Sequence, residues 1–365
     1  MSDQKGPLPA TTEAQDTLHY QFLPPVALTA GDRFPEFFLP DQQGAVRSFI
    51  ERAKGNAIAV LLDPTDLTLQ QAIDHEAACA TAGLDRLAIL GGNEAEVSAR
   101  AARLAVDFPL LADSAGKIRQ QLRQMTGQET VSDSKSPGQS PWLILLDRQQ
   151  RVLEVVAGDD LIARALATWQ GQPPLQPARQ LAQFAPALII PNVLSAQDCN
   201  ALITRWETMG HQEGTVHSVV KGVETRRVLA EAKSRRDHKI DDPLLHRDLG
   251  NVIGRRLAPE LDRAFNFVRF RFDAFIITCY DAERQDHFRR HRDNQSPSTA
   301  NRRFALTLNL NTGDYEGGEL IFPEFGAHLY SPPAGGAILF SCSLLHEARP
   351  VTRGRRFTLL SFLRS

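Results

Sequence analysis

The stretch DHFRRHRDN, Asp286 to Asn294, places two histidines and two aspartates within nine residues. His291 and Asp293 stand two positions apart, and on a strand or at its edge such residues point the same way. A second imidazole comes from His346, which follows the apolar run GGAILFSCSLL. We therefore predict that the chain folds so that His291, Asp293 and His346 meet at one point.

This trio has a defined chemistry. Two neutral imidazoles and one carboxylate form the facial triad of non-haem Fe(II) oxygenases, which leaves coordination positions open for other ligands. Arg356 lies ten residues after His346, in HEARPVTRGRRFTLLSFL, and Gly354 fits a turn that returns the chain as a strand carrying Arg356 inward. Because a guanidinium grips a carboxylate through two parallel hydrogen bonds, a buried Arg356 beside a metal suits the far end of a dicarboxylate cosubstrate.

The surrounding pattern is that of a β-rich domain with flanking helices. From Phe267 onward, short strands rich in Phe, Ile, Leu and Thr alternate with Gly, Pro and Asp turns, which is typical of an antiparallel sandwich or barrel. The paired glycines of YEGGELIFP allow a tight turn before an alternating strand. Upstream, Ser195 caps one expected helix, and DDPLLHRDLGNVIGRRLAPELDRAF predicts another.

Residues from about Ala187 to Ser365 resemble the prolyl 4-hydroxylase-like branch of the 2-oxoglutarate- and Fe(II)-dependent dioxygenases. The matching elements are Tyr280, His291-x-Asp293, LNLNTGDYEGGELIF and HEARPVTRGRRF, while SRRDHKIDD and PALIIPNVLS resemble the family's N-terminal portion. The resemblance implies a double-stranded β-helix, or jelly roll, with flanking helices. It also implies hydroxylation of an unactivated C–H bond with O2, with release of succinate and CO2 and with ascorbate as the iron reductant.

The resemblance assigns roles to individual residues. His291, Asp293 and His346 would bind Fe(II) as the catalytic metal ligands, and Arg356 would bind the distal carboxylate of 2-oxoglutarate, where many relatives have Lys. Tyr280 is expected to line the pocket. The family's common Tyr-Leu-Asn is replaced here by Asn309-Leu310-Asn311, and the Asn309 amide is a candidate contact to the cosubstrate.

Two other readings of DHFRRHRDN fit less well. His287 precedes His291 by four residues, but the intervening Phe-Arg-Arg lacks the glutamate base of the HExxH zinc motif. HRDN is similar to a kinase catalytic loop, yet the DFG and glycine-rich motifs of kinases are missing.

The N-terminal part has a different pattern. AIAVLLDP reads as a buried strand, LTLQQAIDHEAACATAG as one helix ending at Gly83, and a helix opened by Asn93 follows a second strand. Strand–helix alternation of this kind predicts an α/β layer with a parallel or mixed sheet. We predict a loose tail over residues 1–26, this α/β domain over 27–171, a Pro-rich linker over 172–185 and the β-rich domain over 186–365.

Residues from about Leu28 to Thr168 resemble the peroxiredoxin (AhpC/TSA) branch of the thioredoxin fold, on AGDRFPEFFLPDQQGAV, DFPLLADSAGKIRQQL and PWLILLDRQQRVLEVV. The family's peroxidatic loop reads Pro-x-x-x-Thr-x-x-Cys, and the cysteine position is occupied here by Gln71. An amide cannot become the thiolate that peroxide reduction requires. Cys79, eight residues further on, does not replace it in sequence, so this resemblance predicts a fold and not an activity. The role expected for this domain is structural, dimerisation, or recognition of a protein or peptide substrate.

Composition restricts the partners. The net charge of −2 gives no reason to expect nucleic acid, and no apolar run is long enough to span a bilayer. Four widely spaced cysteines without a CxxC pair favour reduced thiols and a cytoplasmic protein. The leading hypothesis is a dioxygenase acting on a prolyl or other residue of a peptide or protein, or on a free amino acid. The alternatives are a non-catalytic sensor or scaffold that binds metal and cosubstrate, and a thiol peroxidase working through Cys79.

Overall fold

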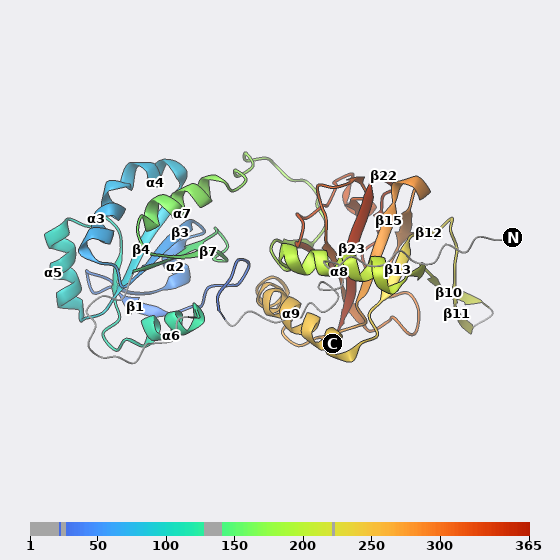
Figure 1. The fold of residues 1–365 in the computed structure, drawn as a ribbon, viewed down its shortest axis with the longest axis horizontal. Helices are drawn as coiled ribbons and strands as arrows, with labels where there is room; N and C mark the ends of the chain where they lie inside the picture. Colours follow the sequence, from blue (N-terminus) through green and yellow to red (C-terminus); the bar gives the residue numbers. More distant parts are fainter. Residues whose placement is uncertain (1–21, 23–26, 128–140, 221–222) are drawn as a thin grey trace. The chain divides into compact units, whose positions relative to one another are not determined.

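The computed structural model describes Phe22 and residues 27–127, 141–220 and 223–365. Their contacts divide into two compact units, one formed by Pro25–Ala178 and one that contains Arg179–Ser365 (Figure 1). The predicted tail lies outside the described residues except for Phe22, which is buried in the core of the C-terminal unit. Residues 172–184 contain no helix or strand.

The N-terminal unit is built on a five-stranded mixed sheet in the order β5-β4-β3-β6-β7. β3, β4 and β5 are parallel, and β6 and β7 are antiparallel to their neighbours. β3 is buried along its whole length because its alternate residues enter the hydrophobic clusters on the two faces of the sheet. This arrangement confirms the predicted thioredoxin-like fold class. The strands are β3 (Ala57–Leu62), β4 (Leu84–Leu90), β5 (Leu110–Ala112), β6 (Trp142–Leu146) and β7 (Val152–Ala157), beside the hairpin β1 (Phe38–Pro40) and β2 (Val46–Ser48).

Local signals begin and end the helices of this unit. Asn93 opens α5, as the sequence predicts, and it also forms a capping box with Glu96. The single helix expected up to Gly83 is wrong, because it is broken at His75, whose Nδ1 lies 2.8 Å from the Gln71 carbonyl oxygen. The helices are α2 (Phe49–Ala53), α3 (Asp66–Asp74), α4 (Glu76–Ala82), α5 (Glu94–Leu104), α6 (Lys117–Met125) and α7 (Leu161–Gln170).

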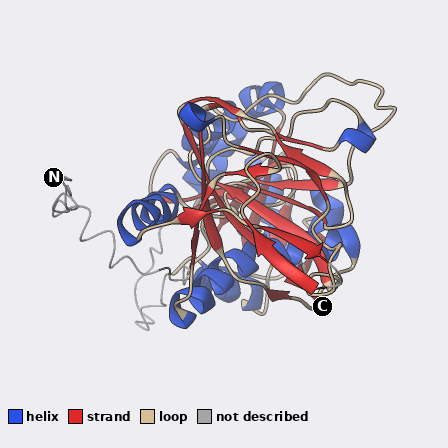
Figure 2. Ribbon diagram, turned by 90° about the vertical axis from the view of Figure 1, so that its right-hand side faces the viewer, coloured by secondary structure: helices blue, strands red, loops and turns tan. Residues whose placement is uncertain are grey.

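The C-terminal unit has a large sheet in the order β8-β20-β17-β23-β15-β13-β9, with β14 also paired to β23. Figure 2, in which strands are red, shows the long strands of this unit lying side by side. The strands are β8 (Ala187–Ile190), β9 (Gln212–Glu213), β13 (Arg236–Lys239), β14 (Arg271–Phe272), β15 (Ile276–Asp281), β17 (Arg302–Asn309), β20 (Ala337–Ser341) and β23 (Arg355–Arg364).

A second, smaller sheet has the order β12-β16-β21-β19. Two all-antiparallel sheets enclose a hydrophobic cluster, which confirms the predicted jelly-roll class. The strands of the smaller sheet are β12 (Lys233–Ser234), β16 (His287–His291), β19 (Leu320–Ile321) and β21 (His346–Ala348), and two further pairs join β10 (Val216–Val220) to β11 (Val223–Arg227) and β18 (Glu316–Gly317) to β22 (Val351–Arg353).

Helices α8 (Ala196–Met209) and α9 (Pro243–Phe265) cover the outer face of the large sheet (Figure 1). The period of two along each strand sorts the side chains between this face and the interior. On β23, Phe357 and Leu359 pack with the helices, whereas Arg356 and Thr358 line an internal cavity. Among the described residues, no helix is both long and apolar enough to cross a bilayer.

Candidate metal centre

An irregularity in strand pairing brings the first two site residues together. β16 pairs with β21, and the register shifts between the pairs Phe288–Ala348 and His291–His346. Three steps on β16 therefore match two on β21, which is the geometry of a β-bulge. The bulge places His291 directly opposite His346, at the ends of two strands that are far apart in the sequence.

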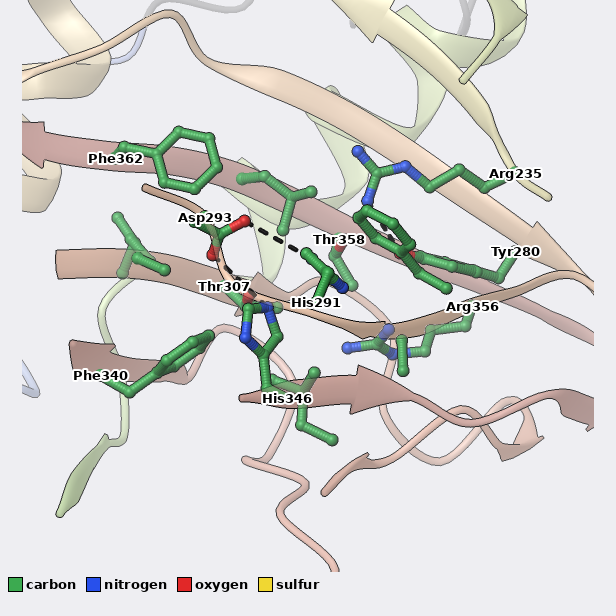
Figure 3. Close-up of a pocket in the computed structure, with 16 residues that line it drawn as sticks. Arg235, Tyr280, His291, Asp293, Thr307, Phe340, His346, Arg356, Thr358 and Phe362 are labelled. Carbon is green, nitrogen blue, oxygen red and sulfur yellow. Dashed lines mark hydrogen bonds and ion pairs between the residues drawn. The ribbon is translucent and has the colours of Figure 1, made fainter. Parts of the chain in front are cut away.

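Asp293 completes the group just beyond the end of β16. Its Oδ1 lies 3.5 Å from His291 Nε2, and its Oδ2 lies 3.4 Å from His346 Nε2. The backbone N–H of Asp293 donates to the Cys342 carbonyl, which ties this turn to the end of β20. Figure 3 shows the three side chains converging. Among the described residues they form the group of His, Cys, Asp or Glu side chains whose ligand atoms lie within 4.8 Å of one another.

Hydrogen bonds orient both imidazoles for metal binding. His291 Nδ1 lies 2.7 Å from the Arg289 carbonyl oxygen, and His346 Nδ1 lies 3.0 Å from that of Leu344. In the neutral tautomer that donates from Nδ1, each Nε2 keeps its lone pair and faces Asp293. The structure therefore presents two nitrogen ligands and a carboxylate on one side of a common point.

The protonation states also suit a metal. Burial lowers the pKa of the His346 imidazole to about 4. Burial raises the pKa of the Asp293 carboxyl, but His346 and His291 beside it outweigh burial and lower that pKa to about 2. At neutral pH His346 is neutral and Asp293 is ionised, which are the forms that bind metals.

Arg356 lies in the same cavity as the triad and is 2% exposed. Its position depends on Gly318, where a Cβ would come within 2.8 Å of the Arg356 Cδ. The guanidinium donates to Asn309 Oδ1 at 2.9 Å, and its Nε has no hydrogen-bond partner. No ion pair joins it to a carboxylate within the described part of the chain. A buried cation without a counter-ion is costly, so this site fits an anionic ligand.

Tyr280 and Asn309 occupy different places. Tyr280 lines the cavity, and the Arg356 guanidinium carbon lies 5.4 Å from the centre of its ring. Asn309 is 1% exposed and is not among the cavity-lining residues. Its amide nitrogen lies 3.0 Å from Thr312 Oγ1 and 3.1 Å from the Tyr315 hydroxyl, while its oxygen accepts from Arg356. In this structure Asn309 holds Arg356, and its contact with a cosubstrate stays a prediction.

Arg235 also lines the cavity, although the sequence analysis did not predict it as a site residue. It is 5% exposed and donates to the Tyr280 hydroxyl at 2.8 Å (Figure 3). It also pairs with Asp237 at 2.8 Å. The signal was present in SRRDHKIDD, because Arg235 and Asp237 are two positions apart on an extended segment. That pattern does not show whether Arg235 or the neighbouring Arg236 points into the cavity.

The donor set and the cavity together fit Fe(II) and a dicarboxylate. Two imidazole nitrogens and one carboxylate on one side leave the other side of a metal open. Most other residues that line the cavity are apolar, among them Leu306, Leu320 and Phe340, and Arg235 is the one further charged residue in the lining. A ligand that chelates the metal at one end and bears a carboxylate at the other would satisfy Arg356.

The remaining sequence candidates lie elsewhere. His287 starts β16, and its Nδ1 lies 3.0 Å from the Gln285 carbonyl oxygen, outside the triad. In the N-terminal unit, the side chain of Gln71 reaches Asp160 at 3.5 Å. Cys79 is 1% exposed in the hydrophobic core, and burial raises the pKa of its thiol. A buried, protonated thiol is a poor nucleophile, which argues against a peroxidase working through Cys79.

Comparisons with known proteins agree with the C-terminal site. Residues 275–364, which include the whole triad and Arg356, match the model of the 2OG-Fe(II) oxygenase superfamily. A PKHD-type hydroxylase of Shewanella sp. (strain MR-7) is 28% identical over 183 residues, which cover 48% of this chain and 77% of that protein. For several other curated relatives, PKHD-type hydroxylases as well, the chain spans about a quarter of their length.

Solved structures resemble each unit separately. A prolyl-4-hydroxylase of Pseudomonas putida aligns with 50% of this chain and 94% of its own, at 20% identity and a TM-score of 0.38. The peroxidoxin BcpB of Mycobacterium tuberculosis aligns with 40% of this chain and 99% of its own, at 22% identity and a TM-score of 0.36. The family model confirms the predicted resemblance of the C-terminal part, since residues 275–364 match the 2OG-Fe(II) oxygenase superfamily.

Proposed function

We propose that the protein is an Fe(II)- and 2-oxoglutarate-dependent dioxygenase that hydroxylates an unactivated C–H bond. The substrate class is a prolyl or other residue in a peptide or protein, or a free amino acid. The observation that carries the proposal is Arg356, a buried guanidinium that has no carboxylate partner among the described residues and lies in the same cavity as the triad. The triad does not account for a buried Arg356, and Arg356 does not account for the triad. A dicarboxylate that chelates a metal at one end and binds Arg356 at the other would account for both.

The chain's own residues divide the work. His291, Asp293 and His346 would hold Fe(II) through Nε2, a carboxylate oxygen and Nε2, with both Nδ1 atoms fixed by backbone carbonyls. Arg356 would bind the distal carboxylate of 2-oxoglutarate, with Asn309 keeping the guanidinium in place. The Tyr280 ring, held by Arg235, closes the side of the cavity beside Arg356.

Fe(II) held by these residues would supply the oxygen chemistry, in which O2, 2-oxoglutarate and a substrate C–H bond give succinate, CO2 and a hydroxylated carbon. The protein contributes position, electrostatics and exclusion of water. Ascorbate as reductant of the iron belongs to the same proposal. The relatives' names, PKHD-type hydroxylase and prolyl-4-hydroxylase, support hydroxylation as the type of reaction.

The test is succinate formation by the purified full chain given Fe(II), 2-oxoglutarate, ascorbate and air. We expect slow turnover that stops when iron is chelated and is absent in His291→Ala. His287→Ala is the matched control, because it removes a histidine of the same strand that lies outside the triad. Equal succinate from the native protein and His291→Ala would contradict the proposed function.

A further inference from the structure

A second, larger cleft opens next to the metal-binding cavity. It has a volume of about 700 Å³, and it shares residues with the inner cavity, among them Arg235, Phe288, His291 and Asp293. A molecule in this cleft would therefore lie beside His291 and Asp293. Eight lysines and arginines but three aspartates line it, and one of these aspartates is the metal ligand Asp293.

The positive charge of this cleft is not neutralised within the described residues. Arg290, Arg292 and Lys239 pair with carboxylates outside the lining. Four of the other five cations share two aspartates, and among the described residues the fifth, Arg289, pairs with no carboxylate. The residues that line the cleft therefore carry more positive than negative charge, and this excess lies at three separate places.

The first place is the pair of buried cations on the Phe288 side. Lys233 and Arg235 are each 5% exposed, and both pair with Asp237, at 3.2 Å and 2.8 Å. The Lys233 ammonium also lies 5.2 Å from the centre of the Phe288 ring. Burial, together with the charge of Arg235, lowers the pKa of Lys233 to about 8, as expected where two cations share one counter-ion.

The second place is at the ends of β17 and β23. Arg302 and Arg364 both bind the same oxygen of Asp273, at 3.1 Å and 2.7 Å. Arg302 also stacks on Phe362, with its guanidinium carbon 3.6 Å from the ring centre. One carboxylate again pairs with two guanidinium groups, so a net positive charge and N–H donors remain at the cleft.

The third place is Arg289, in the bulge of β16. Its Nε donates to the Glu231 carbonyl at 2.6 Å, and no carboxylate pairs with it among the described residues. Because the bulge puts an extra residue into the strand, Arg289, Arg290 and His291 all line the cleft in succession. The same irregularity that builds the metal site therefore also exposes this cation next to it.

We propose that the substrate entering this cleft is an acidic polypeptide segment, whose carboxylates bind the cations around the target residue. The proposal rests on the function proposed above and names the substrate class of the same site. The three places belong to different strands, so one small molecule with a single carboxylate would leave most of the excess charge unmatched. A nucleic acid is disfavoured because the chain as a whole carries a net charge of −2.

The test uses the full chain with Mn(II) in place of iron, 2-oxoglutarate, and fluorescein-labelled peptides followed by anisotropy. The probes are Glu-Glu-Glu-Pro-Ala-Glu-Glu-Glu and the same peptide with Gln, or with Lys, at every Glu. We expect the Glu peptide to bind at least about tenfold more tightly than the Gln peptide at low salt, with a smaller difference at high salt.

Two variants locate the effect. Arg289→Glu reverses an exposed charge and should weaken binding of the Glu peptide about tenfold. Lys233→Met keeps the apolar stem over Phe288 and leaves Asp237 paired with Arg235, and it should weaken binding less. Arg353→Glu is the matched control, since Arg353 is an exposed arginine of the same unit that lines none of the described cavities.

The outcomes separate the two proposals. If calorimetry on the same samples shows no metal-dependent 2-oxoglutarate binding, the proposed function and this inference both fall. If that binding is present but the Glu peptide binds no better than the Gln peptide, or Arg289→Glu and Arg353→Glu behave alike, the inference fails and the function stands. Tighter binding of an oligothymidylate than of the Glu peptide, lost in Arg289→Glu, would also overturn it.

Discussion

In the N-terminal unit, the position that the peroxiredoxin resemblance gives to a nucleophile is Gln71, and the nearby Cys79 is buried in the core. In the C-terminal unit, each position that the dioxygenase resemblance gives to a metal ligand has a side chain that can bind one, and the structure brings these side chains together. Among the described residues, only the second unit brings together a set of side chains that could hold a metal. The difference shows that a fold can be present without the side chains that give a similar fold its chemistry.

The largest expected effect is loss of a metal ligand. Asp293→Ala removes the carboxylate that both imidazoles face, so iron retention and succinate formation should fall by more than about 100-fold, beyond the effect of losing a residue that only supports a ligand. Metal analysis after gel filtration and a succinate assay measure the two losses. His287→Ala should retain both, and iron retained by Asp293→Ala would break the comparison between the units.

The second prediction concerns pH and the metal-free protein. The folded state keeps His346 neutral down to a pKa of about 4, against an ordinary value of 6.5, so between these values the unfolded chain binds more protons. Stability of the C-terminal unit should therefore fall as pH drops from 6.5 to 4, by roughly 3 kcal/mol. Urea unfolding with chelator across this range measures it, and His346→Gln should flatten the dependence. An equal slope in both proteins would contradict this account.

Arg356 gives the next effect. Arg356→Gln keeps a hydrogen-bonding side chain but removes the charge, so the dissociation constant for 2-oxoglutarate should rise about 10- to 100-fold, the equivalent of one charged hydrogen bond. Arg355→Gln is the matched control, because the adjacent Arg355 is exposed and pairs with Glu207 on the surface. Equal affinities in the two variants would show that Arg356 does not bind the cosubstrate.

The smallest effect is expected in the N-terminal unit. Cys79→Ala should leave hydrogen peroxide consumption unchanged, because the thiol is buried and its pKa is raised by burial. A thiol reagent should label the four buried cysteines of the native protein far more slowly than those of the unfolded protein. Peroxide consumption that disappears in Cys79→Ala would give the N-terminal unit a reactive site and remove the contrast.

Much of the site could be predicted from local sequence. The spacing of His291 and Asp293, the later His346, and Arg356 after the turn at Gly354 all follow from strand periodicity and from the family's motif order. The caps at Asn93 and Ser195 follow from side-chain chemistry in the same way. These signals lie within a few residues of the feature that they specify.

Features set by contacts between distant segments could not be predicted. The bulge in β16 depends on its pairing with β21, which lies more than fifty residues away. The hydrogen bond from Arg356 to Asn309 forms because both side chains lie on the same face of the large sheet. The choice of Arg235 over Arg236 as the cavity residue, and the cations that share Asp237 and Asp273, likewise appear only when the strands are assembled.

The most direct test of the central claim is calorimetric binding of 2-oxoglutarate to the native full chain with Mn(II), compared with the metal-free protein and with Arg356→Gln. The account predicts clear binding to the Mn(II)-loaded native protein, strongly weakened binding in Arg356→Gln and little binding without metal. Binding of equal strength in all three samples, or none in a protein that demonstrably holds Mn(II), would contradict the claim that the triad and Arg356 form one site.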